Sequence, residues 1–256
     1  MVLRKLFSRA PRSEQQAAAR QYRLPDGERI YAIGDVHGRL DCLDALMARI
    51  EADKSARGPA DTTLVFLGDL MDRGADSRGV IVRAMEIAAT RPTILLMGNH
   101  EEIFIHAWEG DRRAASLLHR VGGRETVMSY GVDAHDYDAG DLGELTELLG
   151  ERVPASHITF LRNFADSYSR GDYLFVHAGI RPGVALEAQD PSDLRWIRRE
   201  FLEDARDHGP MIIHGHSITE EVDERPNRIG IDTGAFASGK LTAIGIEGTE
   251  RWFLTS

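Results

Sequence analysis

Six apolar segments of strand length recur along the chain, and glycine or histidine residues close each of them. They lie at 30–34, 63–68, 93–98, 173–179, 211–215 and 229–234. Segments this uniformly apolar are typical of strands that are buried on both faces, as in a sheet covered by helices. The pattern therefore predicts a sheet core that is largely shielded from solvent.

Helical periodicity fills the intervals between the first three of these segments. Apolar residues recur at helical spacing over 40–50 and again over 80–88. The order strand, helix, strand, helix, strand predicts an α/β unit with parallel strands in the first half of the chain. Residues 101–165 are predicted to be mainly helical, with a polar loop at 131–143 that could form a cap over a site.

The two ends of the chain carry different patterns. The tail from 240 to 253 predicts two strands joined by a turn at Glu247 and Gly248. Residues 1–29 hold seven basic side chains against three acidic ones, which predicts a basic N-terminal arm. No internal repeat or proline-rich linker divides the remainder, so one domain over 30–256 is expected.

Composition narrows the class of protein. The 256 residues are 42% hydrophobic and include one cysteine, which is typical of a globular chain and excludes a disulfide within it. No apolar run reaches the roughly 18 residues of a membrane span, and the N-terminus lacks the apolar region of a secretory signal. We therefore expect a cytoplasmic protein without stable membrane insertion. The net charge of −10 argues against binding to nucleic acid.

Metal-capable side chains follow the predicted strands. They are Asp35, His37, Asp69, Asn99, His100, His177, His214 and His216. Because ligands bind beyond the carboxyl ends of the strands in open α/β sheets, we expect these side chains to converge. Oxygen and imidazole donors without a thiolate suit Mn²⁺, Fe²⁺ or Zn²⁺. Their number suffices for two ions bridged by one carboxylate, and Asp69 is central in chain order.

Competing catalytic motifs are incomplete. A thiol phosphatase needs arginine six positions after its cysteine, but Ala48 stands six positions after Cys42. The pair that begins at His100 is not a zincin motif, because position 104 is phenylalanine. The segment 234–240 approaches a P-loop, but Leu241 occupies the place of the magnesium-binding serine or threonine, so a tight turn between strands is expected there.

Three motifs carry a resemblance to a known family. The segments 34–38 (GDVHG), 68–74 (GDLMDRG) and 98–101 (GNHE) resemble the signature motifs of the metallophosphoesterase superfamily, in its bacterial and phage-type serine/threonine phosphatase branch. The similarity continues in order to about residue 254 and includes 231–234 (IDTG). It implies an α/β fold of two mixed β-sheets sandwiched between helices, with a small helical cap.

The resemblance also implies a role for individual residues. The ligands of the first metal would be Asp35, His37 and Asp69, and those of the second would be Asp69, Asn99, His177 and His216. The catalytic group would comprise His100 as the acid, Asp72 that orients it, and Arg73 and Arg198 that hold the phosphoryl oxygens. His214 is predicted either to be structural or to support a ligand. Ser217 and Ile218 replace the usual threonine and proline, which alters the expected loop.

The expected activity is metal-dependent hydrolysis of phosphoserine and phosphothreonine monoesters, with phosphotyrosine as a further substrate. A hydroxide shared by two divalent ions, Mn²⁺ in the first place and Fe or Zn otherwise, would attack phosphorus directly. The partner would be a phosphoprotein or a small phosphoester. One alternative is hydrolysis of dinucleoside polyphosphates such as diadenosine tetraphosphate by the same centre. Another is a non-catalytic metal-binding scaffold on the same fold.

Overall fold

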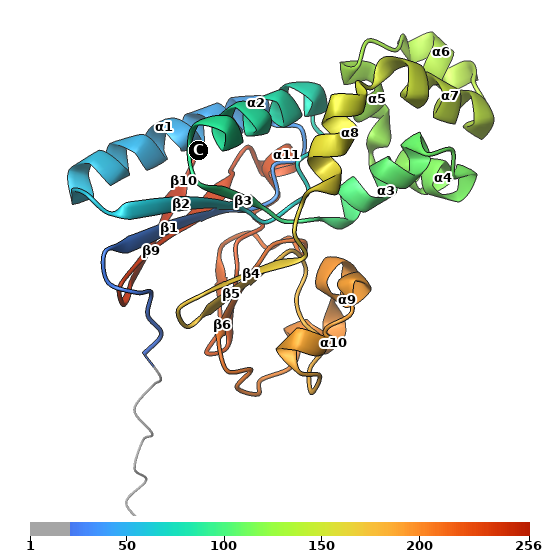
Figure 1. Ribbon diagram of the computed structural model, residues 1–256. Helices are drawn as coiled ribbons and strands as arrows, with labels where there is room; N and C mark the ends of the chain where they lie inside the picture. Colours follow the sequence, from blue (N-terminus) through green and yellow to red (C-terminus); the bar gives the residue numbers. More distant parts are fainter. Residues whose placement is uncertain (1–20) are drawn as a thin grey trace, which may run out of the picture.

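A computed structural model describes residues 21–256, in which two five-stranded sheets lie between layers of helices (Figure 1). The first sheet has the order β10-β9-β1-β2-β3, with β1 Glu28–Ile33, β2 Asp61–Phe66, β3 Thr93–Leu95, β9 Thr242–Glu247 and β10 Glu250–Thr255. The second has the order β4-β5-β6-β8-β7, with β4 Ser167–Arg170, β5 Tyr173–Val176, β6 Met211–His214, β7 Asp223–Glu224 and β8 Arg228–Gly230. These positions confirm the predicted strands, whereas the edge strands β4 and β7 were not predicted.

Both sheets are mixed. In the first, β1, β2 and β3 are parallel, whereas β9 runs antiparallel to both β1 and β10. In the second, β5, β6 and β8 are parallel, and the edge strands β4 and β7 are antiparallel to their neighbours. The carboxyl ends of three parallel strands thus come together in each sheet.

Alternation along β1 shows how the layers pack. Tyr31 and Ile33 contact the helices, in a cluster that includes residues of α1 (Leu40–Arg57) and α2 (Ser77–Thr90). Ile30 and Ala32 point the opposite way and pack between the two sheets. A third cluster covers the outer face of the second sheet with α9 (Pro191–Trp196) and α10 (Arg199–Leu202). The helix–sheet–sheet–helix arrangement confirms the expected fold class.

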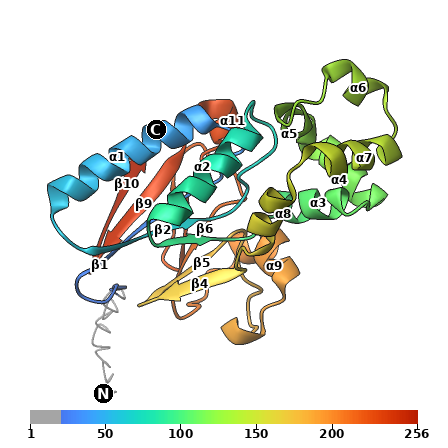
Figure 2. The ribbon, with the colours of Figure 1, turned by 45° about the horizontal axis from the view of Figure 1, so that its top comes forward.

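A group of helices projects beyond the sheets on one side of the molecule (Figure 2). It comprises α3 Asn99–Trp108, α4 Arg112–Val121, α5 Gly123–Ser129, α6 Ala134–Ala139, α7 Leu142–Arg152 and α8 Ala155–Arg162. The expected polar loop at 131–143 was wrong in part, because Asp133 accepts a hydrogen bond from the His135 N–H and starts α6. Tyr137 is buried in this helix and its hydroxyl lies 2.9 Å from His119 Nδ1 on α4. The segment is therefore packed onto the other helices.

Two shorter regions also differ from expectation. The segment 234–240 contains a one-turn helix, α11 (Ala235–Ser238), where a tight turn was predicted. The fold includes residues before the expected boundary at residue 30, because Leu24 is fully buried between the sheets. The part of the predicted arm from 1 to 20 lies outside the described residues. A 3₁₀ turn, η1 (Leu186–Ala188), completes the elements.

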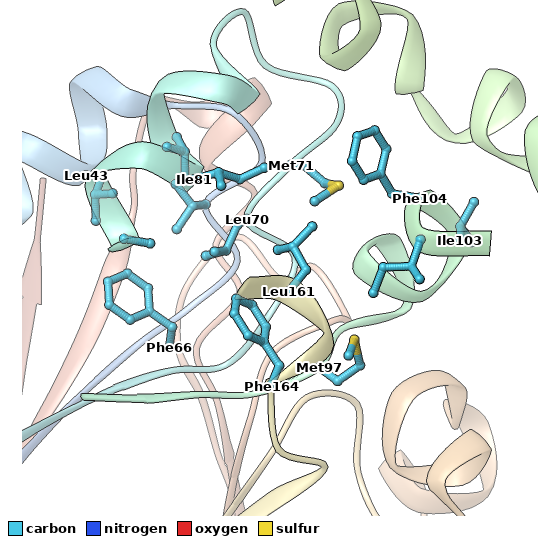
Figure 3. Packing of buried hydrophobic residues seen from close by; sticks show 14 of the residues in the cluster. Leu43, Phe66, Leu70, Met71, Ile81, Met97, Ile103, Phe104, Leu161 and Phe164 are labelled. Carbon is cyan, nitrogen blue, oxygen red and sulfur yellow. The ribbon is translucent and has the colours of Figure 1, made fainter. Parts of the chain in front are cut away.

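The loop after β2 is anchored in the helix-side core (Figure 3). Leu70 and Met71 are fully buried in the same cluster as Phe104 of α3 and Leu161 of α8. These two apolar residues separate Asp69 from Asp72. Burial of a large apolar side chain contributes about 1.5–3 kcal/mol, so this packing holds the polar residues on either side in place.

The helices described between residues 21 and 256 include none with the length and apolar character of a membrane span.

Candidate metal centre

The candidate residues lie where the carboxyl ends of the parallel strands of both sheets meet. Asp35 and His37 follow β1, Asp69 follows β2, and Asn99 follows β3. In the second sheet, His177 and His216 follow β5 and β6. All of these side chains are buried. The structure thus brings together residues that are up to 181 positions apart, since the His216 N–H donates to Asp35 Oδ2 over 2.9 Å.

Asp69 stands at the middle of the cluster. Its Oδ2 lies 3.7 Å from His37 Nε2, 3.8 Å from His100 Nε2 and 3.4 Å from His177 Nε2. Two groups of potential ligands share this carboxylate, one with His37 and His100 and the other with His177 and His216. Within each group the ligand atoms lie within 4.8 Å of one another. A carboxylate shared in this way can bridge two cations.

Backbone carbonyls set the orientation of two imidazoles. His37 Nδ1 lies 2.7 Å from the Met71 carbonyl, and His177 Nδ1 lies 2.8 Å from the Leu67 carbonyl. Because a carbonyl oxygen only accepts hydrogen bonds, both Nδ1 atoms carry the hydrogen. Each Nε2 is therefore the atom that faces Asp69. This arrangement is typical of histidines that bind metals, in which a second hydrogen bond fixes the tautomer.

Several buried polar atoms lack a hydrogen-bond partner. Among the described residues these include Asp35 Oδ1, His216 Nε2 and Asp232 Oδ2. The three residues that carry these atoms are only 2%, 5% and 1% exposed, so water does not freely solvate them. A buried polar atom without a partner costs about 1–3 kcal/mol. Open carboxylate oxygens on the neighbouring residues Asp35 and Asp232, beside the imidazoles of the cluster, are suited to binding a divalent cation, and the residues present fit such an ion.

The acidic groups of the cluster strongly perturb one another. Burial, followed by the charges of Asp232 and Asp69, raises the pKa of Asp35 well above its ordinary value. Burial also raises the pKa of Asp232. Burial alone would raise the pKa of Asp69 too, but the nearby His177 and His100 hold it well below its ordinary value. Asp35 and Asp232 are therefore costly to ionise without additional positive charge close by.

Glu101 supports the loop that carries Asp69. Its carboxylate accepts hydrogen bonds from the backbone N–H groups of Asp69 (2.8 Å), Leu70 (2.7 Å) and Gly98 (3.0 Å). A β-carbon at Gly98 would overlap Asp69 Oδ1, so this position requires glycine. Burial, together with the charge of Asp69, raises the pKa of Glu101 to about 7. The two glycine-containing motifs that hold these residues are therefore physically joined.

His100 is held by a short chain of hydrogen bonds. Its Nδ1 lies 2.6 Å from Asp72 Oδ2, and Thr126 of α5 donates to the other oxygen of Asp72 over 2.6 Å. On the opposite side of the ring, Nε2 lies 3.2 Å from Arg73 Nη2, from which it can accept a hydrogen bond when the ring is neutral. Burial lowers the pKa of His100, but Asp69 and Asp72 outweigh it, so the pKa lies above its ordinary value. An imidazole in this setting can act as a general acid.

Arg198 adjoins the same centre from the second sheet. Its Nη1 donates to the backbone carbonyl of His216 over 3.3 Å, and its side chain is exposed. The preceding helix α9 is tied to α3, because Trp196 Nε1 and Arg195 Nη1 donate to the Glu102 carboxylate over 2.5 and 2.6 Å. The structure therefore places all ten candidate residues in one neighbourhood.

Backbone conformation singles out the same residues. Among residues 21–256, the non-glycine residues with a left-handed φ are His37 (46°), Asp69 (51°), Asp72 (69°), Arg73 (68°) and His216 (62°). Each is a candidate site residue. Such conformations cost about 1–3 kcal/mol and cluster at functional sites. Their concentration here supports a functional role for this region.

His214 belongs to a different environment from His216. Its ring packs edge-on against Phe201, with 5.2 Å between the ring centroids, and its Nε2 lies 3.4 Å from Arg228 Nη1. Burial lowers the pKa of His214 to about 4. Of the two roles considered for it, these contacts support the structural one.

Two residues of the centre were not identified as functional from the sequence. Glu101 ends the third motif and Asp232 lies in the 231–234 segment, so both were quoted only as parts of a resemblance. A signal for Asp232 was available, since it follows the apolar segment of β8 as Asp35 follows that of β1. Local sequence does not predict how Glu101 is used. Two of the three backbone N–H groups that it binds lie 31 and 32 positions away, and only the third, that of Gly98, is three positions away.

Comparison with known proteins places this centre in a family. A symmetrical bis(5'-nucleosyl)-tetraphosphatase from Acidovorax sp. (strain JS42) is 30% identical over 159 residues, which cover 62% of this chain and 46% of the relative. The chain thus spans about half the length of that protein. Serine/threonine-protein phosphatase 2 from Salmonella typhimurium (strain LT2) is 26% identical over 222 residues, which cover 83% of this chain and 90% of the relative.

A solved structure shares this fold, and a family model matches most of the chain. The solved structure of a protein proposed to be a diadenosine tetraphosphatase has the same fold, with a TM-score of 0.61, 19% identity, and coverage of 90% of this chain and 94% of the other. The family model for calcineurin-like phosphoesterases matches residues 28–230, which contain the three motifs and both histidines of the second sheet. These findings confirm the resemblance seen in the sequence, and the chain belongs to the calcineurin-like phosphoesterase family.

Proposed function

We propose that this protein is a phosphatase that uses two divalent metal ions to hydrolyse phosphoserine and phosphothreonine monoesters in proteins, with phosphotyrosine as a further substrate. The observation that carries the proposal is the position of the His100–Asp72 pair and of Arg73 beside the Asp69-centred cluster. These groups match the three needs of phosphomonoester hydrolysis: a metal site, a proton donor and a cation for the phosphoryl oxygens.

The residues of the chain divide the work as follows. Asp35, His37 and Asp69 would hold one ion, and Asp69 with Asn99, His177 and His216 would hold the other. Two such ions, for which Mn²⁺ is the first candidate, lower the pKa of a water molecule and polarise the phosphoryl oxygens. The chain's own groups then bind the substrate and move the proton.

His100 would protonate the leaving oxygen. The attacking water would first lose one proton to solvent. As its oxygen bonds to phosphorus, the bond from phosphorus to the seryl or threonyl oxygen breaks, that oxygen takes the proton from His100 Nε2, and His100 regains a proton from solvent. Asp72 keeps Nδ1 occupied and stabilises the protonated ring. Arg73 and Arg198 would bind the non-bridging oxygens, where guanidinium groups form charge-assisted hydrogen bonds.

A second candidate function is hydrolysis of dinucleoside polyphosphates, which the names of two of the compared proteins favour. Coverage does not separate the two functions, because 90% of the serine/threonine phosphatase and 94% of the solved structure proposed to be a diadenosine tetraphosphatase are covered. One observation supports the phosphoprotein substrate instead: the third motif ends in Glu101, which in the family resemblance is typical of the protein phosphatase branch.

A substrate comparison tests the proposal. The purified protein, loaded with Mn²⁺, is assayed for kcat/KM on an aryl phosphate, on phosphoserine, phosphothreonine and phosphotyrosine peptides, and on diadenosine tetraphosphate. We expect the highest kcat/KM on a phosphopeptide, and a loss of kcat of about 10⁴-fold for an Asp69→Asn variant prepared in the same way. A preference for diadenosine tetraphosphate would establish the second candidate function, and trapping of a phosphorylated enzyme would contradict direct hydrolysis.

A further inference from the structure

One aromatic side chain contacts both a candidate metal ligand and a candidate phosphoryl-binding arginine. The Phe236 ring packs edge-on against His37, with 5.6 Å between the ring centroids and 87° between the planes. The guanidinium carbon of Arg73 lies 4.8 Å from the centre of the same phenyl ring. Phe236 belongs to none of the motifs that define the candidate site.

Arg73 depends on such a contact for its position. Its backbone is fixed, because its N–H donates to the Gly122 carbonyl over 2.8 Å and its φ is 68°. Its guanidinium, in contrast, forms no ion pair with a carboxylate of residues 21–256, and its side-chain hydrogen bond there is the one to His100 Nε2. The half-buried ring of Phe236 is therefore a principal restraint on the charged end of this side chain.

The element that carries Phe236 is itself rigid. Its first residue, Ala235, accepts a hydrogen bond at its carbonyl from Arg39 Nη1 over 2.7 Å. The single Ser238 hydroxyl hydrogen is shared between the carbonyls of Thr233 and Gly234, which lie 2.8 and 3.0 Å from Oγ, and this contact closes the turn. A ring mounted on such a turn loses little conformational freedom when it restrains another group.

We propose that Phe236 is a positioning residue that holds the Arg73 guanidinium toward the phosphoryl group through a cation–π contact. The inference rests on the proposed function, in which Arg73 binds non-bridging oxygens. A cation within about 6 Å of an aromatic face is attracted to it, and more strongly where water is partly excluded. The aromatic face, and not apolar bulk alone, is then what the position requires.

Substitutions at Phe236 distinguish a requirement for an aromatic face from a requirement for apolar bulk. We expect Phe236→Ala and Phe236→Leu each to lower kcat/KM on an aryl phosphate by about 3- to 30-fold, and to weaken inhibition by inorganic phosphate to a similar extent. Phe236→Tyr retains the aromatic face and should restore both values to within about 2-fold of the unsubstituted protein. If Phe236→Leu matched the unsubstituted protein in both measurements, the cation–π role would be wrong.

A double-mutant cycle tests whether Phe236 acts through Arg73. In an Arg73→Ala background, Phe236→Leu should have no further effect on phosphate affinity. An equal effect in both backgrounds would overturn the proposal. Ile218→Ala is the matched control: this side chain is 50% exposed and packs beside Gly234, next to α11, so its loss should leave phosphate affinity unchanged. Manganese content and the melting temperature are measured for every variant to confirm folding and loading.

Phosphate affinity also separates this inference from the proposed function. Calorimetric titration of the manganese-loaded protein with inorganic phosphate needs no turnover. If the protein hydrolysed no phosphomonoester but the cycle still showed coupling in phosphate binding, the proposed function would fail and the role of Phe236 would stand. If it hydrolysed phosphomonoesters without coupling, the role of Phe236 alone would fail.

Discussion

The loops after the first sheet and those after the second build the candidate centre in different ways. The first sheet contributes the three carboxylates Asp35, Asp69 and Asp72, and four of the five left-handed non-glycine residues between 21 and 256. Its loops are anchored by Glu101 and by Leu70 and Met71 in the core. The second sheet contributes the imidazoles of His177 and His216 and the carboxylate of Asp232.

This difference indicates which sheet determines the orientation of the candidate ligands. His177 takes its orientation from the Leu67 carbonyl, which belongs to the first sheet's side of the centre, and His216 N–H donates to Asp35. The first sheet therefore orients the donors of the second. Its strained backbone costs about 1–3 kcal/mol at each left-handed residue, and the buried packing of the loop offsets that cost. Changes on the first side should accordingly have the larger effects.

The largest effect is expected at Asp69. Asp69→Asn removes the charge shared by both groups of ligands, so we expect about a 10⁴-fold loss of kcat with bound manganese falling to a small fraction of the original. Steady-state kinetics and elemental analysis of the purified protein measure both. Asp61→Asn, at the exposed start of the same strand, is the control. Retention of two metals and of full activity in Asp69→Asn would refute the central role of this carboxylate.

The next effect concerns proton transfer alone. His100→Asn should lower kcat by about 10²-fold on a phosphoserine peptide while KM and metal content stay close to their original values. An aryl phosphate with a good leaving group needs less protonation, so its kcat should fall less. His106→Asn, an exposed histidine on the same helix, serves as the control. Equal losses on both substrates would mean that His100 does not act as the acid.

On the second sheet, two histidines of the same segment should respond differently. His216→Asn should weaken manganese affinity by about 10- to 100-fold, because its Nδ1 lies 3.1 Å from His177 Nε2 at the centre. His214→Asn should leave the affinity within about 3-fold but lower stability by about 1 kcal/mol, since its ring packs on Phe201. Calorimetric metal titration and thermal unfolding measure the pair. Equal losses of metal affinity would show that His214 supports the centre after all.

The smallest effect is on stability. Manganese at about 100 times its Kd should stabilise the protein by about 2.7 kcal/mol, a rise in Tm of several degrees. Burial raises the pKa of Asp232, so its ionised form destabilises the metal-free fold at neutral pH. Metal-free Asp232→Asn should then unfold at a higher temperature than the metal-free original at pH 7, and the gap should narrow as the pH falls through the raised pKa.

Metal addition and a control complete this test. The stabilisation by manganese should be smaller in Asp232→Asn, because less negative charge remains to be neutralised. Asp61→Asn should change neither melting temperature, since its side chain is exposed. A metal-free Asp232→Asn protein that unfolded at a lower temperature than the original would show that the carboxylate is favourable even without a cation.

Much of the centre could be predicted because its residues follow strands directly. Asp35, Asp69 and Asn99 stand two, three and four positions after β1, β2 and β3, and the parallel order of these strands places them at one edge. The helix α6 was missed because its capping residue, Asp133, lies in a segment (131–143) that is rich in glycine and aspartate, which are also typical of loops. Polar composition obscures a short capped helix of this kind.

The sequence by itself determined much of the chemistry of this protein: where eight of its ten described strands lie, and that carboxylate and imidazole groups stand at or just after the ends of several of them. Periodicity and spacing carry this information because they are local. Only the tertiary structure decided which histidine of 214 and 216 faces the centre, that Glu101 holds three backbone groups, and that Phe236 lies against Arg73. These facts depend on contacts between segments distant in the chain, and the packing of two sheets, rather than any local pattern, brings those segments together.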